Sequence, residues 1–114
     1  MTRTLQIALA VVLLAIALVV THFVVTPGNV GLLDWYEPVD DHTIRIGTTT
    51  GDFTWTRVTA VVESPAEVRV TVTSTGWPLV TTGDVGRDFE VLVSLEQPLG
   101  DRRVFDPFHE VPRR

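Results

Sequence analysis

The sequence predicts one membrane-spanning α-helix followed by an all-β domain, a small antiparallel sandwich or open barrel of five to six strands. Three observations support this fold class. A long uncharged apolar segment lies near the N-terminus, the hydrophobic pattern has a period of two from about residue 43, and no later segment has the period of a helix. The chain has 114 residues, which is enough for one domain.

The N-terminal apolar segment is long enough to cross a bilayer. Residues 5–25 carry no formal charge and read LQIALAVVLLAIALVVTHFVV. At about 1.5 Å per residue they form a helix of roughly 31 Å, close to the thickness of the hydrocarbon core. We predict an uncleaved signal anchor, because the apolar run is longer than that of a typical signal peptide. Cleavage at the small-residue pattern Ala15-Ile16-Ala17 is the alternative.

The charges on either side of this helix predict its orientation. Arg3 and the terminal amine precede the helix, whereas the first charged residues after it are acidic. The positive-inside rule therefore places residues 1–4 in the cytoplasm and the rest outside. The predicted location is the cell membrane, crossed once, with an extracytoplasmic C-terminal domain.

Residues 26–42 are predicted as a linker between the helix and the domain. Pro27 and Gly28 end the helix, because proline cannot continue it and glycine favours turns. Two interpretations of Trp35 and Tyr36 stay open. Their rings could rest at the membrane interface, where amphipathic aromatic residues are favoured, or they could cap the core of the outer domain.

Residues 43–106 are predicted as the β-domain, with residues 107–114 as a C-terminal tail. Ser64-Pro65-Ala66 separates two alternating segments and predicts a hairpin, and Gln97-Pro98-Leu99-Gly100 fits a type I turn after which the last strand returns. The expected strands are 43–47, 54–63, 67–73, 89–95 and 102–106, with 79–81 as a candidate for a sixth.

The composition excludes several classes of function. There is no cysteine, and fourteen acidic residues outnumber nine basic ones, giving a net charge of -5. The missing cysteine excludes disulfides and thiolate chemistry, and the acid excess argues against a nucleic-acid partner. Without disulfides the domain must rely on its valine faces, on a partner or the membrane, and on four aromatic residues: Phe53, Trp55, Trp77 and Phe89.

No motif in the sequence indicates catalysis. The chain lacks a glycine-rich phosphate loop, a G-x-S-x-G elbow and an H-E-x-x-H pair, so we predict no enzymatic activity, no cofactor and no small-molecule substrate. Acidic residues and histidines are close together in the sequence at only two places, residues 40–42 and 106–110. Neither has a recognised ligand spacing, so we predict no metal site; the candidate ligands are Asp40, Asp41, His42, His109 and Glu110.

Residues 54–106 also carry a resemblance. The segments are VVES at 61–64, VRVTV at 68–72, VLVSL at 91–95 and PLGDRRVFD at 98–106. Their order resembles small membrane-anchored or secreted β-rich proteins of unknown function from high-GC Gram-positive bacteria. The resemblance implies a β-rich envelope protein and no particular activity.

We therefore predict a single-pass membrane protein whose extracytoplasmic β-domain is a binding or structural module of the cell envelope. Its partners would be the membrane and an envelope protein. The candidate edge for a partner strand is Arg103, Val104 and Phe105. The alternative is an accessory subunit of a larger membrane complex that docks through its helix, and an enzyme is the third choice.

Overall fold

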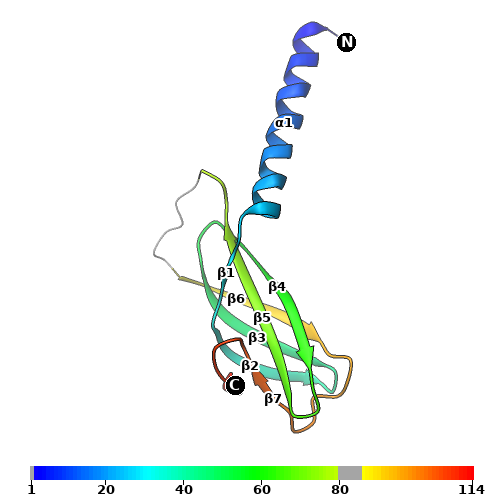
Figure 1. Ribbon diagram of the computed structural model, residues 1–114, viewed down its shortest axis with the longest axis vertical. Helices are drawn as coiled ribbons and strands as arrows, with labels where there is room; N and C mark the ends of the chain where they lie inside the picture. The colour runs from blue at the N-terminus through cyan, green and yellow to red at the C-terminus, as the bar shows by residue number, and fades with distance from the viewer. Residues whose placement is uncertain (1, 80–85) are drawn as a thin grey trace.

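The computed structural model describes residues 2–79 and 86–114. An α-helix and a β-sandwich follow one another along the longest dimension of the molecule, which measures 64 Å (Figure 1). Helix α1 spans Arg3–Val25, and two β-sheets form the rest. The predicted fold class, an N-terminal apolar helix followed by antiparallel sheets of about six strands, is confirmed.

Helix α1 is long and apolar enough to cross a membrane, and none of its residues is buried by the rest of the chain. Its 23 residues extend over about 35 Å. The hydroxyl of Thr2 accepts a hydrogen bond from the Leu5 N–H at 3.3 Å and caps the first turn. Thr26 has extended backbone angles and ends the helix.

The strands form two sheets that face each other across the core. In the first sheet, β5 is central, with β4 on one side and β1 and β7 on the other. Its strands are β1 (Asn29–Val30), β4 (Thr54–Glu63), β5 (Glu67–Gly76) and β7 (Arg103–Phe105). The second sheet has the order β2-β3-β6, formed by β2 (Leu33–Asp40), β3 (Thr43–Gly51) and β6 (Gly86–Ser94).

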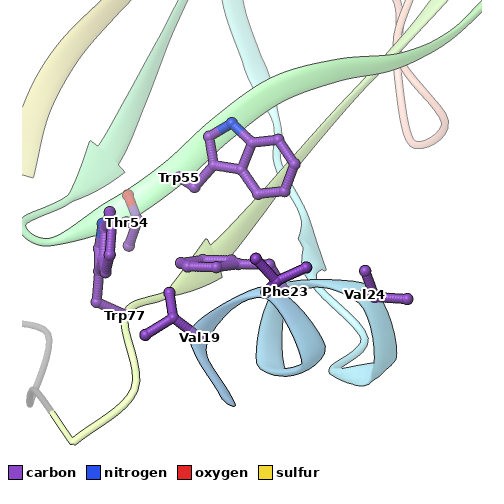
Figure 2. Close-up of a pocket in the computed structure, with 7 residues that line it drawn as sticks. Val19, Phe23, Val24, Thr54, Trp55 and Trp77 are labelled. Atoms are coloured by element: carbon purple, nitrogen blue, oxygen red, sulfur yellow. The ribbon is translucent and has the colours of Figure 1, made fainter. Parts of the chain in front are cut away.

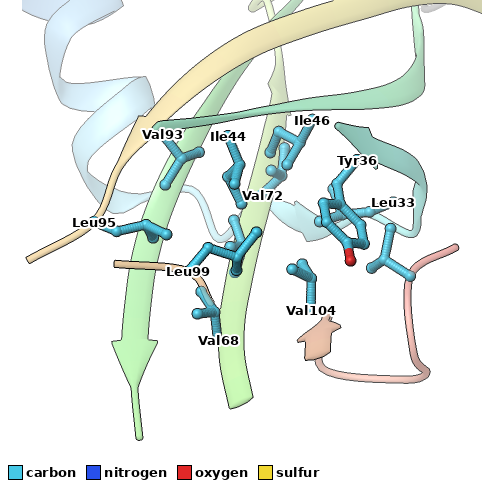
Figure 3. Packing of buried hydrophobic residues seen from close by; sticks show 12 residues of the cluster. Leu33, Tyr36, Ile44, Ile46, Val68, Val72, Val93, Leu95, Leu99 and Val104 are labelled. Atoms are coloured by element: carbon cyan, nitrogen blue, oxygen red, sulfur yellow. The ribbon is translucent and has the colours of Figure 1, made fainter. Parts of the chain in front are cut away.

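The apolar core lies between the sheets and depends on the predicted alternation. Ile44 and Ile46 of β3 and Val68 and Val70 of β5 are 0% exposed. Burying such a side chain stabilises the fold by about 1.5–3 kcal/mol, so the core supplies stability that disulfides would otherwise provide. The other buried apolar residues are Leu33, Tyr36, Val72, Val93, Leu95, Leu99, Val104 and Val111 (Figure 3).

The predicted linker, residues 26–42, is wrong over most of its length, because it contains β1 and β2. Leu33 and Tyr36 of β2 are core residues with 1% and 8% of their surface exposed. A register shift between Leu33 and Trp35 breaks the alternation of β2, and this irregularity hides the strand from a search for a period of two.

The predicted tail, residues 107–114, instead packs against the domain. The Val111 side chain is 2% exposed, and its N–H donates to the Val104 carbonyl at 2.8 Å. The Tyr36 N–H donates to the Pro112 carbonyl at 3.0 Å, and the Arg114 N–H donates to the Tyr36 carbonyl at 2.7 Å. Residues 112–114 therefore run beside β2, to which they are joined by an isolated bridge between Tyr36 and Arg113.

The strand connections confirm the predicted hairpin and correct the predicted return of the last strand. β4 and β5 form the hairpin closed by Ser64-Pro65-Ala66. β7 does not return beside β6: it joins the first sheet and runs parallel to β5. Residues 95–102 therefore cross from one sheet to the other, and the Leu99 N–H donates to the Asp41 carbonyl at 2.8 Å on the way. The candidate strand at 79–81 lies almost entirely outside the described residues.

Trp35 packs on the neighbouring strand of its own sheet, outside the core cluster to which Tyr36 belongs. Its indole occupies the space next to Gly47, on the neighbouring strand, and the Arg114 guanidinium lies 4.3 Å from the ring centroid. A Cβ atom at position 47 would overlap the indole. Glycine at this position therefore allows the ring to cover the strand.

Gly47→Ala is accordingly expected to destabilise the protein by about 1–3 kcal/mol, because the indole has to move. The urea-unfolding midpoint of the full chain in detergent, followed by tryptophan fluorescence, measures the effect. Gly31→Ala is the matched control, because a Cβ at Gly31 would be 3.8 Å from its nearest neighbours, an ordinary contact distance. Equal midpoints for the two variants would contradict the close packing of Trp35 on Gly47.

Candidate membrane-facing site

Three aromatic rings meet where α1 joins the first sheet. Phe23, in the last turns of α1, makes edge-to-face contacts with Trp55 of β4 and with Trp77, which follows β5. The ring centroids are 5.4 Å and 5.0 Å apart, and Figure 2 shows the Phe23 ring directed from α1 toward both indoles. Such pairs contribute about 0.5–1.5 kcal/mol each beyond the burial of their surface. They attach the end of the helix to the domain.

His22 adds a polar contact at the same junction. Its Nε2 lies 2.8 Å from the Gly76 carbonyl oxygen, and its Nδ1 lies 3.3 Å from the Thr26 hydroxyl. A carbonyl can only accept a hydrogen bond, so Nε2 is the donor, and Nδ1 can accept from Thr26. A neutral imidazole with its proton on Nε2 satisfies both partners.

An apolar hollow of about 600 Å³ opens beside these rings. Helix residues form one wall, and residues of the first sheet form the other (Figure 2). Both indoles remain partly exposed despite their contacts with Phe23, Trp55 by 46% and Trp77 by 47% of its surface. The lining residues are Val19, Val20, Phe23, Val24, Thr54, Trp55 and Trp77.

The turns at this end of the domain also carry apolar side chains. Phe53, between β3 and β4, is 63% exposed, and Leu79 is fully exposed. Both residues have positive φ angles, 53° and 63°, which are rare for residues with side chains. The Trp77 N–H donates to the Phe53 carbonyl at 3.0 Å and holds the two turns together. Exposed apolar side chains therefore continue from the hollow onto these turns, where the Asp52–Arg87 ion pair also lies.

Arg57 marks the outer limit of this apolar surface. It follows Trp55 by two residues on β4, so both side chains lie on the same face of the sheet. The guanidinium carbon lies 4.0 Å from the Trp55 ring centroid, within the range of a cation–π interaction. Nη1 donates to the Trp55 carbonyl and to the Thr75 hydroxyl, each at 3.0 Å.

The interior of the same end is polar. The Thr50 hydroxyl lies 2.9 Å from that of Thr54 and 2.8 Å from that of Thr56, and Thr56 lies 2.8 Å from the Ser74 hydroxyl. These hydroxyl groups satisfy one another between the sheets, where the apolar core ends. The core of the domain is therefore separate from the aromatic surface that faces α1.

None of the four aromatic residues expected to stabilise the domain lies in its core: Phe53, Trp55 and Trp77 are exposed, and Phe89 is half-buried outside the core cluster. The sequence contains a signal for this difference. Side chains of β4 alternate between two faces. One face carries Thr54, Thr56 and Val58, of which Val58 packs against the core, and the other face carries Trp55, Arg57 and Thr59. The charge on Arg57 therefore indicates that Trp55 shares an outward face.

The predicted metal candidates belong to two separate structural turns. Asp40, Asp41 and His42 lie at the β2–β3 turn, where the Asp40 carboxylate accepts from the His42 N–H at 2.9 Å. This bond is the main reason that the pKa of Asp40 is lowered. His109 and Glu110 lie in the C-terminal segment. Within residues 2–79 and 86–114, no three His, Cys, Asp or Glu side chains form a group that could hold a metal ion.

The predicted partner edge at Arg103, Val104 and Phe105 is not free. β7 pairs with β5 on one side, and on the other side Val104 accepts from the Val111 N–H and Phe105 bridges to Glu110. The Arg103 side chain is bound by both oxygens of Glu110. Among the strands that the structure describes, β1, β4 and β6 have an outer edge with no paired strand, and β4 and β6 are the long ones.

Comparison with protein-family models, with curated proteins and with solved structures gives no match to this chain.

Proposed function

We propose that this is a single-pass membrane protein that holds a β-sandwich against the outer face of the membrane, as a binding or structural module of the cell envelope. The junction of Phe23 with Trp55 and Trp77 carries the proposal. It places an aromatic surface of the domain beside the end of a membrane-length apolar helix. Tryptophan is favoured at this depth, where its ring is partly in lipid and its N–H meets water.

The junction also fixes the height of the domain above the membrane. The contacts of Phe23 and the His22–Gly76 hydrogen bond leave no free tether between α1 and the first sheet. The Gly28 backbone adds to this, because a Cβ there would overlap the Thr73 side chain of β5. A domain held in this way presents the same surfaces at a constant distance from the bilayer, as a binding or structural module requires.

The free edge of β4 is the surface that we assign to an envelope-protein partner. An edge strand presents unpaired N–H and C=O groups that an extended partner segment can bind. β4 also carries two exposed apolar side chains far from α1, Val61 at 37% and Val62 at 62%. A partner strand on β4 would cover these side chains and pair with the backbone.

The membrane topology can be tested directly, because the chain has no cysteine of its own. We expect a membrane-impermeant maleimide to label Asp101→Cys on intact cells and to label Thr4→Cys only after the cells are opened. Asp101 lies in an exposed turn, and Thr4 lies in the first turn of α1. Labelling of Thr4→Cys alone on intact cells would overturn the proposed orientation.

The partner surface needs a second experiment. The full chain is purified from its native membranes in mild detergent, and a partner found with the wild type is followed in two variants. Val62→Lys is expected to lose the partner, and Val39→Lys, a similarly exposed valine of β2, is expected to keep it. If replacing residues 3–18 with an unrelated apolar helix removes the partner, α1 is the docking surface and the β4 assignment is wrong.

A further inference from the structure

We propose that the hollow between α1 and β4 binds one membrane phospholipid, with an acyl chain against Val19, Phe23 and Trp55 and the phosphate on the Arg57 guanidinium. The inference rests on the proposed function, since it requires α1 to span the bilayer beside the domain. To the proposed function it adds a ligand, a phospholipid, and the residue that binds the phosphate of this ligand, Arg57.

The depth of the hollow identifies the apolar part of the ligand. Val19 lies six residues before the last residue of α1, and therefore about 9 Å from the helix end. If α1 spans the bilayer, this wall lies within the hydrocarbon layer. The helix wall of this hollow consists of Val19, Val20, Phe23 and Val24, whose side chains offer no hydrogen bonds to water. An acyl chain fills the hollow with apolar contacts.

The positions of Phe23, Trp55 and Arg57 match the change from hydrocarbon to headgroup. The Phe23 ring contacts the Trp55 ring, and the Trp55 ring in turn contacts the Arg57 guanidinium. Along β4, residues 55 and 57 are about 7 Å apart. The headgroup layer is about 5–8 Å thick on each side of the membrane. When Trp55 lies at the boundary of the hydrocarbon, Arg57 is therefore at the level of the lipid phosphates.

Arg57 has the hydrogen-bonding capacity that a phosphate needs. The three hydrogen bonds of its guanidinium within the described residues all use Nη1 and go to neutral oxygens. Nη2 and Nε can therefore donate to a phosphate in the forked arrangement that suits arginine. The ring of Trp55 and the Thr75 hydroxyl hold the guanidinium in place before the ligand arrives.

The charge pattern of the domain supports an anionic ligand at Arg57. The domain has fourteen acidic residues and eight arginines, and most of these arginines are paired with a carboxylate. Arg57 has no such pair in the part of the chain that the structure describes. Its positive charge lies beside the exposed ring of Trp55 and the apolar hollow.

Brominated lipids test the position of the acyl chain. The full chain is reconstituted into phosphatidylglycerol–phosphatidylcholine vesicles whose acyl chains carry bromine near the headgroup or near the chain end. Two single-tryptophan variants are compared: one keeps Trp55 (Trp35→Phe with Trp77→Phe), and the other keeps Trp35 (Trp55→Phe with Trp77→Phe). We expect strong quenching of Trp55 by bromine near the headgroup and little quenching of Trp35, which packs on Gly47. Weak quenching of both would overturn the proposal.

Bound lipid is counted by native mass spectrometry of the full chain in mild detergent. Arg57→Gln is expected to lower lipid occupancy about tenfold, the effect of losing about 1.4 kcal/mol of binding free energy. Arg57→Lys keeps the charge but lacks the forked donor pair, so its lipid occupancy should lie between those of the wild type and Arg57→Gln. Arg114→Gln is the matched control, because Arg114 also lies over a tryptophan, Trp35, but in the other sheet.

Two results would overturn the lipid assignment. One is equal lipid occupancy in Arg57→Gln and Arg114→Gln, and the other is a co-purifying membrane helix that occupies the hollow in place of lipid. The maleimide labelling of Asp101→Cys reports separately on topology. A correct topology with no effect at Arg57 therefore removes this inference alone, whereas a reversed topology removes the proposed function as well.

Discussion

Asp106→Ala is expected to lower the free energy of unfolding by about 3–5 kcal/mol. The Asp106 side chain is 0% exposed. Its Oδ2 accepts from the Leu33 N–H at 2.8 Å and lies 2.8 Å from His109 Nδ1. Its Oδ1 accepts from the N–H groups of Phe108 and His109 at 2.7 Å and 2.8 Å. The carboxylate thus joins the end of β7, in the first sheet, to the start of β2, in the second.

The size of the effect follows from what the substitution leaves behind. Alanine has no acceptor, so the buried Leu33 N–H and the two N–H groups of the C-terminal segment lose their partner together. Small domains are stable by about 5–15 kcal/mol in total, so one such loss is a large share. Urea unfolding of the full chain in detergent measures it. Asp101→Ala is the control, because Asp101 is exposed, and equal midpoints for the two variants would contradict the role of Asp106.

The same carboxylate makes stability depend on pH. Burial alone raises the pKa of Asp106, but the hydrogen bonds from Leu33, Phe108 and His109 outweigh burial, and the net pKa is lowered. The pKa of Glu63 is also lowered, chiefly by the Glu96 N–H. A lowered pKa in the folded state stabilises the fold above the unfolded value of about 4, and the contribution is lost as the pH falls through the folded value. Unfolding midpoints between about pH 5 and pH 2 should therefore fall less in Asp106→Asn than in the wild type.

The fold could be predicted where a residue's neighbours along the chain determine its environment. The helix and the strands at 54–63 and 67–73 depend on uniform apolarity or on simple alternation, as in Val68, Val70 and Val72. β2 could not be predicted, because its bulge breaks the alternation. Asp106 is harder still, since its partner Leu33 is 73 residues away and contributes a backbone N–H, which leaves no pattern in the sequence.

The candidate membrane-facing site could be predicted only in part from the sequence. The apolar helix is visible, but Phe23, Trp55 and Trp77 lie in three separate segments. Their contact depends on the pairing of β4 with β5, which sets Trp55 opposite Thr75, two residues before Trp77. The choice of outward face for Trp55 depends in turn on the register of that hairpin. Aromatic residues in a small domain without disulfides suggest a core. The charge on Arg57 argues against this for Trp55, but no such signal exists for Phe53 or Trp77.

Arg102 holds together the end of the domain that is farthest from α1. Its side chain is only 10% exposed, and Nη2 donates to the Glu63 carboxylate at 3.0 Å. The other acceptors are the backbone carbonyls of Gln97 and Pro98 at 2.9 Å, and of Ser64 and Leu99 at 3.3 Å. One guanidinium therefore links the β4–β5 turn to the crossover between β6 and β7.

Arg102→Met is expected to destabilise the protein by about 3–5 kcal/mol. Methionine fills the space but removes the cation beside the shielded Glu63 carboxylate, which keeps only the N–H donors of Glu96 and Gln97, and it removes the side-chain donor of four carbonyls. Arg102→Lys should be less harmful, since it keeps the charge, but a single ammonium group cannot reach all five acceptors of the planar fork. Arg103→Met is the matched control one residue later. Its 64%-exposed side chain pairs with Glu110 in solvent, so its loss should change stability little. Urea midpoints in the order Arg103→Met, Arg102→Lys, Arg102→Met, from highest to lowest, would show that the crossover depends on Arg102; equal midpoints would show that the apolar core holds it without the guanidinium.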